Sequence, residues 1–170
     1  MSHPDRDKLN KALAVFDNAD DGKLLTHLNS CVHCGLCAES CLYYTATGDT
    51  RFTPAQKVEL VSSIYRRYCT LTGRYLPWLV NARELDNEAL GELTDQLFGA
   101  CTICGRCTLH CSIGIDIGYL VRTGRRMLSE LDMVPQTLQS TVDAAVETGN
   151  NMAITKEEFV STIRWMEEEL

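Results

Sequence analysis

Apolar residues recur at helical spacing along most of this chain. Between residues 5 and 18, Leu9, Leu13 and Phe16 are three or four positions apart, which places them on one face of a helix. Sustained alternation of apolar and polar residues, the pattern of a half-buried strand, is weak throughout. The pattern therefore predicts helices and gives little support to a sheet.

Capping residues predict where the next helix begins. Thr53 comes directly before Pro54, and Gln56 follows two residues later. A threonine hydroxyl accepts a hydrogen bond from a free amide at a helix start, and proline loses nothing at the first helical position. We expect a helix to about Tyr68, with three residues on its buried face: Val58, Val61 and Tyr65.

Four more helices combine a start or stop signal with an apolar stripe. The range 86–99 begins after the cap Asp86, and Asp116 can cap another helix. Pro135 can open a helix that closes at Gly149, and Thr155 with Glu158 forms a capping box. The apolar residues on these helices are Leu90, Leu93 and Leu97, then Tyr119, Leu120 and Leu128, and finally Phe159, Ile163 and Met166. The fold class predicted is all-α, with two loop regions where cysteines cluster.

The two cysteine-rich loops share one spacing. Residues 31–41 read CVHCGLCAESC and residues 101–111 read CTICGRCTLHC, with gaps of two, two and three in both. This run ligates cubane [4Fe-4S] clusters, because closely spaced thiolates can reach three irons of one cube, and the fourth cysteine ligates the other cluster. We therefore assign Cys31, Cys34, Cys37 and Cys111 to cluster 1, and Cys101, Cys104, Cys107 and Cys41 to cluster 2.

Gly35 and Gly105 follow the second cysteine of each motif. A residue without Cβ allows a tight turn that brings amide N–H groups toward sulfur, which raises the potential of a cluster. Leu42 and Ser112 stand where small bacterial ferredoxins have proline, so a close match to those proteins is not expected. Zinc prefers two separated pairs of ligands, and disulfides require an oxidising compartment; both remain weaker alternatives.

Charge and composition exclude several function classes. The 170 residues carry a net charge of −7, which does not suit nucleic-acid binding. No apolar run is long enough to span a bilayer, so we expect no direct membrane insertion. The polar start MSHPDRDKLN lacks a secretory signal, and we expect a cytoplasmic protein.

The remaining candidates carry less signal. His33 and His110 lie beside cysteines that already complete two clusters, and a lone Cys69 is more often a buried apolar side chain. The stretch 65–80 mixes arginine with aromatic residues, as interfaces do, although a solvated helix face explains it equally well. Three arginines after the second motif either soften the charge of a cluster or are simply exposed: Arg122, Arg125 and Arg126. No phosphate loop or catalytic constellation is present, so an electron carrier is the direct inference.

These motifs, separated by some sixty helical residues, resemble the helical dicluster domain of the C-type iron–sulfur protein of heterodisulfide reductase. The resemblance covers roughly residues 25–130 and implies an N-terminal helical segment (1–24) and a C-terminal helical extension (131–170) that serves as a docking tail. It implies electron relay between a flavin-containing A-type partner and a B-type partner with CCG cysteine motifs, in sulfur metabolism. Iron–sulfur subunits of succinate, fumarate, glycolate or glycerol-3-phosphate enzymes are similar, and a free dicluster ferredoxin is a further alternative.

Overall fold

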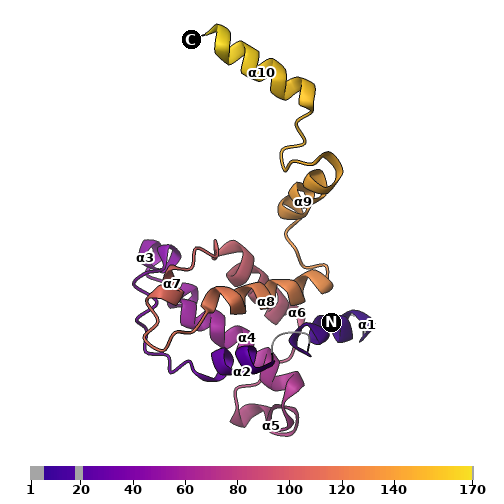
Figure 1. Cartoon of the computed structure of the whole chain (residues 1–170). Helices are drawn as coiled ribbons and strands as arrows, with labels where there is room; N and C mark the ends of the chain where they lie inside the picture. Colours follow the sequence, from indigo (N-terminus) through magenta and orange to yellow (C-terminus); the bar gives the residue numbers. More distant parts are fainter. Residues whose placement is uncertain (1–5, 18–20, 170) are drawn as a thin grey trace. The chain divides into compact units, whose positions relative to one another are not determined.

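The computed structural model describes residues 6–17 and 21–169 (Figure 1), and in those ranges the regular structure is helical with no strand. The α-helices are α1 (Arg6–Asp17), α2 (Asp21–Asn29), α3 (Leu42–Thr47), α4 (Pro54–Cys69), α5 (Leu71–Tyr75), α6 (Asn87–Thr94), α7 (Arg106–Leu109), α8 (Ile117–Glu130), α9 (Gln136–Thr148) and α10 (Lys156–Glu168). Three single turns complete them: η1 (Thr50–Phe52), η2 (Pro77–Leu79) and η3 (Asp95–Gly99). The all-α prediction is confirmed.

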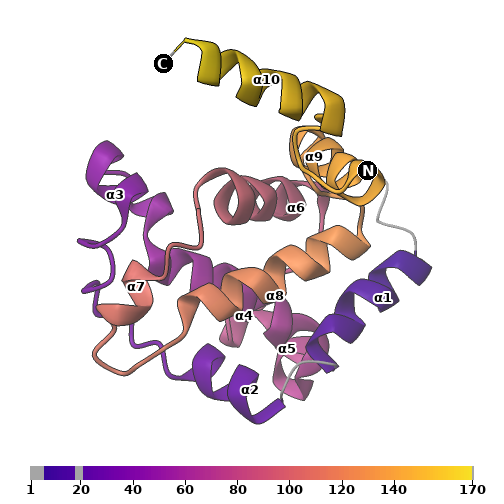
Figure 2. The ribbon, with the colours of Figure 1, turned by 45° about the horizontal axis from the view of Figure 1, so that its top comes forward.

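The chain divides into two compact units, one ending at Met133 and one beginning at Val134. In the first unit α8 packs against α1 and α4 (Figure 2), because its apolar residues share one face. Phe16 of α1 is buried in the same core as the apolar residues of α4 and α8. The N-terminal segment that the sequence suggested over 1–24 therefore contributes its helix to the unit that holds the cysteine motifs.

One glycine allows the central helices to approach closely. A Cβ built on Gly124 of α8 would lie 2.6 Å from Cδ1 of Leu97 and 3.1 Å from Cγ2 of Val61. Both neighbours are fully buried, so neither can easily move away. The contact between α8, α4 and η3 thus depends on the absence of a side chain at this position.

The predicted helix starts are confirmed where the sequence placed a cap. The side chains of Thr53, Asp86 and Asp116 each accept a hydrogen bond from a backbone amide in the first turn of α4, α6 and α8. Thr155 and Glu158 form the predicted capping box. These local signals act within one turn, so they do not depend on tertiary packing.

The predicted helix over 86–99 differs at its end. It is α-helical to Thr94 and then widens to one π turn, in which the amide of Ala100 donates to the carbonyl of Asp95 (2.8 Å). The Nε of Arg125 donates to the carbonyl oxygen of Leu97 at 2.8 Å. A side chain from α8 thus bonds a carbonyl of the widened turn, a partner that local periodicity could not reveal.

The sequence analysis missed the short helices α2, α3, α5 and α7. Each spans at most nine residues, too few to establish a helical period. Of these, α2 contributes the buried residues Leu24 and Leu28 to the core. Tertiary packing therefore stabilises these helices more than their own sequences do.

The second unit contains α9 and α10. Gly149, at φ +81°, ends α9 in the left-handed conformation that the sequence predicted for a helix stop. Several large apolar residues on these two helices are exposed: Leu138, Val142, Val146, Phe159, Ile163, Trp165 and Met166. In the part of the chain that the structure describes, no helix combines the length and apolar character needed to cross a bilayer.

Candidate metal centres

The two cysteine motifs follow the same backbone path. Gly35 and Gly105 both lie in the left-handed region, at φ +82° and +76°. The amide of Ala38 donates to the carbonyl of Gly35 (2.9 Å), and Thr108 donates to Gly105 in the same way (3.0 Å). The repeat in the cysteine spacing is therefore a repeat in three dimensions, and each glycine is required for the turn because other residues rarely adopt this φ.

A second positive φ occurs between the first two cysteines of each motif, at His33 (+52°) and Ile103 (+54°). In the second motif this turn directs the amide of Ile103 to the sulfur of Cys101 at 3.4 Å. The amide of Ile115 likewise donates to Cys111 Sγ at 3.4 Å. Amide donors to sulfur are therefore present, although these residues were not the ones that the sequence suggested.

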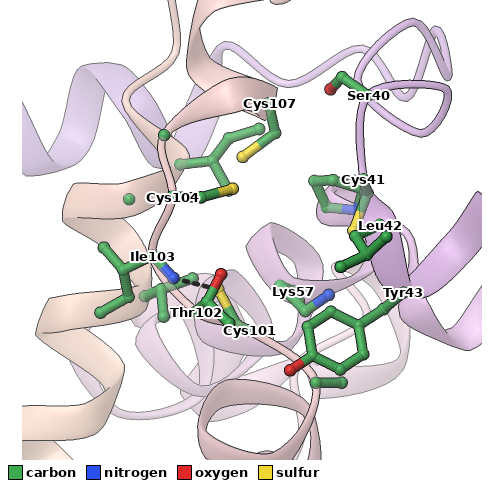
Figure 3. A pocket seen from close by; sticks show the side chains of 16 residues that line it. Ser40, Cys41, Leu42, Tyr43, Lys57, Cys101, Thr102, Ile103, Cys104 and Cys107 are labelled. Carbon is green, nitrogen blue, oxygen red and sulfur yellow. Dashed lines mark hydrogen bonds between the residues drawn. The ribbon is translucent and has the colours of Figure 1, made fainter.

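One cavity, named cavity 2, joins the second motif to the last cysteine of the first (Figure 3). Cys41 is the N-cap residue of α3 and faces three cysteines across the space: Cys101, Cys104 and Cys107. Side chains of α4 and α8 form further walls, among them Lys57 and Val121. The four sulfurs come from segments about sixty residues apart in the chain, so only the folded chain can assemble this set.

The other cavity, named cavity 1, has the reciprocal composition. Cys111, the last cysteine of the second motif, lines it together with Cys31, Cys34 and Cys37. Its other walls are apolar and include Ile113 and Ile115. Ile117 lines both cavities and is buried, so a single side chain of α8 lies between the two sites.

The dimensions of the cavities suit a group of several atoms. Cavity 2 encloses about 480 Å³ and cavity 1 about 360 Å³ of space free of protein atoms, against roughly 30 Å³ for one water molecule. All nine cysteines are described and none forms a disulfide. No three Cys, His, Asp or Glu side chains in the described ranges converge on a point that would hold one metal ion. The donor set thus fits a cubane cluster better than a zinc ion.

Burial changes the acidity of two cysteines at these sites. It raises the pKa of the Cys37 thiol, with a smaller contribution from neighbouring cysteines, while a hydrogen bond with the backbone of Ala55 acts in the opposite direction. It also raises the pKa of Cys107 to about 11. Thiolates are the form that binds iron, so iron binding at these positions has to displace tightly held protons.

Comparison with known proteins agrees with this arrangement. Residues 27–115 match the 4Fe-4S dicluster domain, a span that includes all eight motif cysteines and more than half of the chain. The chain belongs to the 4Fe-4S dicluster domain family. Members of the family carry two [4Fe-4S] clusters, and these are the cofactors of this chain. The ligand sets remain a prediction, which the two four-cysteine cavities support.

Relatives within the dicluster family come from archaea. An Hdr-like menaquinol oxidoreductase iron-sulfur subunit 2 of Archaeoglobus fulgidus is 38% identical over 127 residues, which is 75% of this chain and 23% of the relative. A corresponding protein of Archaeoglobus profundus is 36% identical over the same shares. The D-type component of a dihydromethanophenazine:CoB–CoM heterodisulfide reductase from Methanosarcina barkeri is 29% identical over 68% of this chain and 27% of the relative. The chain is thus an Hdr-like iron–sulfur protein that spans about a quarter of each relative.

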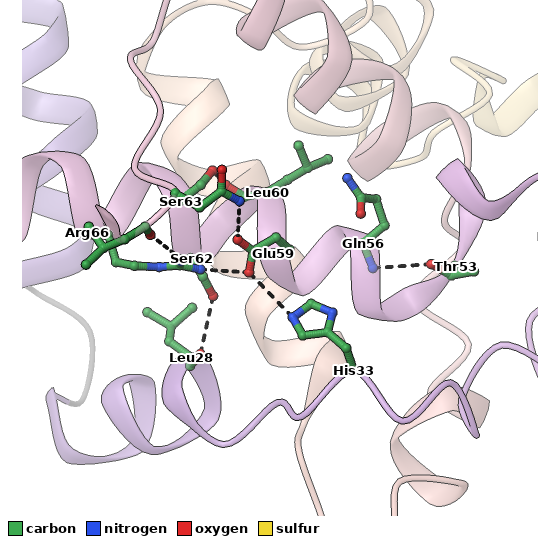
Figure 4. Close-up of polar contacts among 11 residues, drawn as sticks. Leu28, His33, Thr53, Gln56, Glu59, Leu60, Ser62, Ser63 and Arg66 are labelled. Carbon is green, nitrogen blue, oxygen red and sulfur yellow. Dashed lines mark hydrogen bonds and ion pairs between the residues drawn. The ribbon is translucent and has the colours of Figure 1, made fainter. Parts of the chain in front are cut away.

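A polar cluster holds the first motif of this dicluster domain against α4 (Figure 4). Nε2 of His33 lies 3.6 Å from Oε2 of Glu59, which also accepts from Arg66 at 2.7 Å. Asn81 donates to the other carboxylate oxygen at 2.8 Å. His33 thus contacts a carboxylate, and three donors around Glu59 fix the loop that carries Cys31 and Cys34.

The remaining candidates from the sequence have different surroundings. Arg122 and Arg126 are exposed, whereas Arg125 is half-buried and donates to the carbonyl of Cys101 at 2.5 Å. Cys69 is half-buried at the end of α4, as expected for a small apolar side chain. The sequence analysis missed Lys57, which lines cavity 2. Its one signal was its position, three residues after Pro54 in a helix with an otherwise apolar buried face.

Proposed function

We propose that the chain is the electron-relay component of a cytoplasmic heterodisulfide reductase-like complex of sulfur metabolism. In this proposal single electrons pass through two [4Fe-4S] clusters between a flavin-containing A-type partner and a disulfide-active B-type partner with CCG cysteine motifs. The observation that carries it is the pair of four-cysteine cavities that share the wall residue Ile117. Two adjacent one-electron centres are the arrangement that a relay requires.

Each cavity lies near the surface at one of its cysteines. Cys34 of cavity 1 and Cys104 of cavity 2 are exposed, while Cys37 is buried. Large exposed apolar residues flank both sites: Val32, Leu36 and Ile113 at cavity 1, and Leu42 and Leu109 at cavity 2. Exposed apolar surface around a redox centre supports a docking site for a protein partner at each cavity.

The protein residues have three tasks in this proposal. The cysteines hold the clusters, each of which supplies a one-electron couple between the 2+ and 1+ states. The buried isoleucines and Val121 exclude water from the cavities, and the amides of Ile103 and Ile115 stabilise negative charge on sulfur. Backbone donors of this kind raise the potential of a cluster.

We propose further that the C-terminal extension (131–170) is a docking tail. Its helices α9 and α10 expose apolar residues, and such residues are more often found in contact with a partner than with water. Deleting residues 134–170 should leave both clusters in place and abolish co-purification with the partner proteins. Loss of iron from the truncated chain would contradict this assignment.

The names of the relatives support a second candidate partner. Two of them belong to menaquinol oxidoreductases, which makes a quinol-oxidising protein an alternative to the flavoprotein as the electron donor. Anaerobic purification from the native host distinguishes the candidates, because the complex then contains either a flavoprotein or a quinol-reactive protein. Elution of the chain alone would instead favour a free dicluster ferredoxin.

The test of the relay is removal of one ligand. Cys104→Ala should reduce the iron content from about eight to about four atoms per chain and stop electron transfer through the complex. The matched control is Cys69→Ala, which removes the one cysteine outside both motifs and should retain full iron and full electron flux. Retention of both properties in Cys104→Ala would refute the proposal.

A further inference from the structure

Lys57 is a buried cation at cavity 2. It lies on α4 with only 2% of its surface exposed, and it lines the cavity that Cys41 shares with the second motif (Figure 3). Its Nζ donates a hydrogen bond to the carbonyl oxygen of Phe52 at 2.8 Å. An ammonium group has three donors, so two of them remain for acceptors other than this carbonyl.

A buried ammonium group requires a negative partner. Transfer of an isolated charge from water into a protein interior costs several kcal/mol, so buried lysines are normally paired. Within residues 6–17 and 21–169, no aspartate or glutamate forms an ion pair with Lys57. The compensating negative charge therefore has to come from another group.

The cysteines of cavity 2 are the nearest source of that charge. The sulfur of Cys41 lies 3.7 Å from the same Phe52 oxygen that Lys57 contacts. Four thiolates on a cubane cluster carry more negative charge than the iron–sulfide core neutralises, and each reduction adds one more electron. The ammonium of Lys57 is thus placed where it attracts the reduced cluster more strongly than the oxidised one.

Cavity 1 has no equivalent charge. No lysine or arginine is among the residues that line it. Thr53 and Asp116 are the N-cap residues of α4 and α8, and the position of α8 that matches Lys57 is the apolar Leu120. Arg125 adds to the difference, because its guanidinium donates to the carbonyl of the cavity 2 residue Cys101.

We propose that Lys57 raises the reduction potential of cluster 2 above that of cluster 1, so that the first electron to enter the chain resides at cavity 2. This rests on the proposed ligand sets, in which Cys41 binds cluster 2. An electron would then move from cavity 1 toward cavity 2 with a favourable potential difference. The asymmetry in charge gives a direction to two sites whose cysteine motifs are otherwise alike.

The test is a redox titration of the holoprotein, followed by electron paramagnetic resonance. Cys34→Ser and Cys104→Ser first assign the two signals, because each changes the spectrum of one cluster. Lys57→Met, which keeps the length and removes the charge, should then shift the reduction equilibrium of cluster 2 about tenfold toward the oxidised form, or about 59 mV for one electron. Cluster 1 serves as the internal control and should shift less.

Two further variants separate charge from hydrogen bonding and from folding. Lys57→Gln keeps a donor group without the charge and should shift cluster 2 as Lys57→Met does, whereas Lys57→Arg should stay near the wild type. An unchanged potential in Lys57→Met or Lys57→Gln protein with full iron content would overturn the proposal. Loss of cluster 2 from both neutral variants would also overturn it, since Lys57 would then serve assembly.

Failure of the Lys57 proposal is distinguishable from failure of the proposed function. The ligand sets are tested by iron content and by the two serine variants before any lysine variant is made. The relay is tested by partner co-purification and electron flux, which do not depend on Lys57. A chain with two correctly ligated clusters and no response to loss of Lys57 would refute the tuning role alone.

Discussion

Cys41 and Lys57 contact one carbonyl oxygen, that of Phe52, with Sγ at 3.7 Å and Nζ at 2.8 Å. Cys41 belongs to the first cysteine motif and Lys57 to α4, yet both line the cavity of the second motif. The turn η1, which ends at Phe52, thus connects a predicted ligand to a buried cation. This contact distinguishes cavity 2 from cavity 1, although their motifs have identical spacing.

The crossing of ligands between motifs predicts which variants share a phenotype. Cys111→Ala should lose the same cluster as Cys34→Ala, because both residues line cavity 1. Cys41→Ala should lose the same cluster as Cys104→Ala, because both line cavity 2. Electron paramagnetic resonance of the reduced variants identifies which cluster remains. If Cys111→Ala instead gave the spectrum of Cys104→Ala, each motif would hold its own cluster.

Removal of the clusters should loosen the chain locally. The loops 31–41 and 101–111 contain few regular helical hydrogen bonds, and binding of metal contributes to the free energy of folding. After anaerobic chelation of iron, we expect amide exchange to accelerate in both loops while the contact between α4 and α8 stays protected. Hydrogen-exchange mass spectrometry measures this difference. Unchanged exchange in the loops would show that the protein fold alone holds them.

Cys69 should react slowly with alkylating reagents. Burial raises the pKa of its thiol to about 11, and the nearby carboxylate of Asp17 adds to the effect. The thiolate is the reactive form, so labelling of the holoprotein by iodoacetamide should be slow at pH 8 and accelerate as the pH rises toward 11. Any stability that this shift contributes is complete below pH 9 and decreases between pH 9 and 11. Peptide mass spectrometry quantifies the label, and rapid labelling at pH 7 would contradict the buried position.

Two glycine-to-alanine variants should change stability in opposite directions. Gly124→Ala places a methyl group 2.6 Å from the buried Leu97, and overpacking of this kind costs about 1–3 kcal/mol. Gly91→Ala on α6 has no heavy atom within 4 Å of the new Cβ, and it should stabilise the protein by up to about 1 kcal/mol through helix propensity. Chemical denaturation of the holoproteins measures both. Equal stability of the two variants would exclude close packing at Gly124.

Local signals account for the parts of the fold that were predicted correctly. Thr53, Asp86 and Asp116 cap helices because the oxygen and the amide it accepts from are within three residues of each other. The π turn at the end of α6 could not be predicted, because its carbonyl partner Arg125 lies 28 residues away from Leu97. Lys57 was missed for the same reason: helical periodicity records that a residue faces inward, and it does not record what it faces.

The amino-acid order specifies the helices, the cofactor type and the number of ligands, because caps and cysteine spacings act over a few residues. The apposition of Cys41 with the second motif and of Cys111 with the first arises only when α4 and α8 pack together. The placement of Lys57 beside one cavity and not the other has the same origin. Coulomb energy depends on distance and burial in space, which no spacing along the chain records.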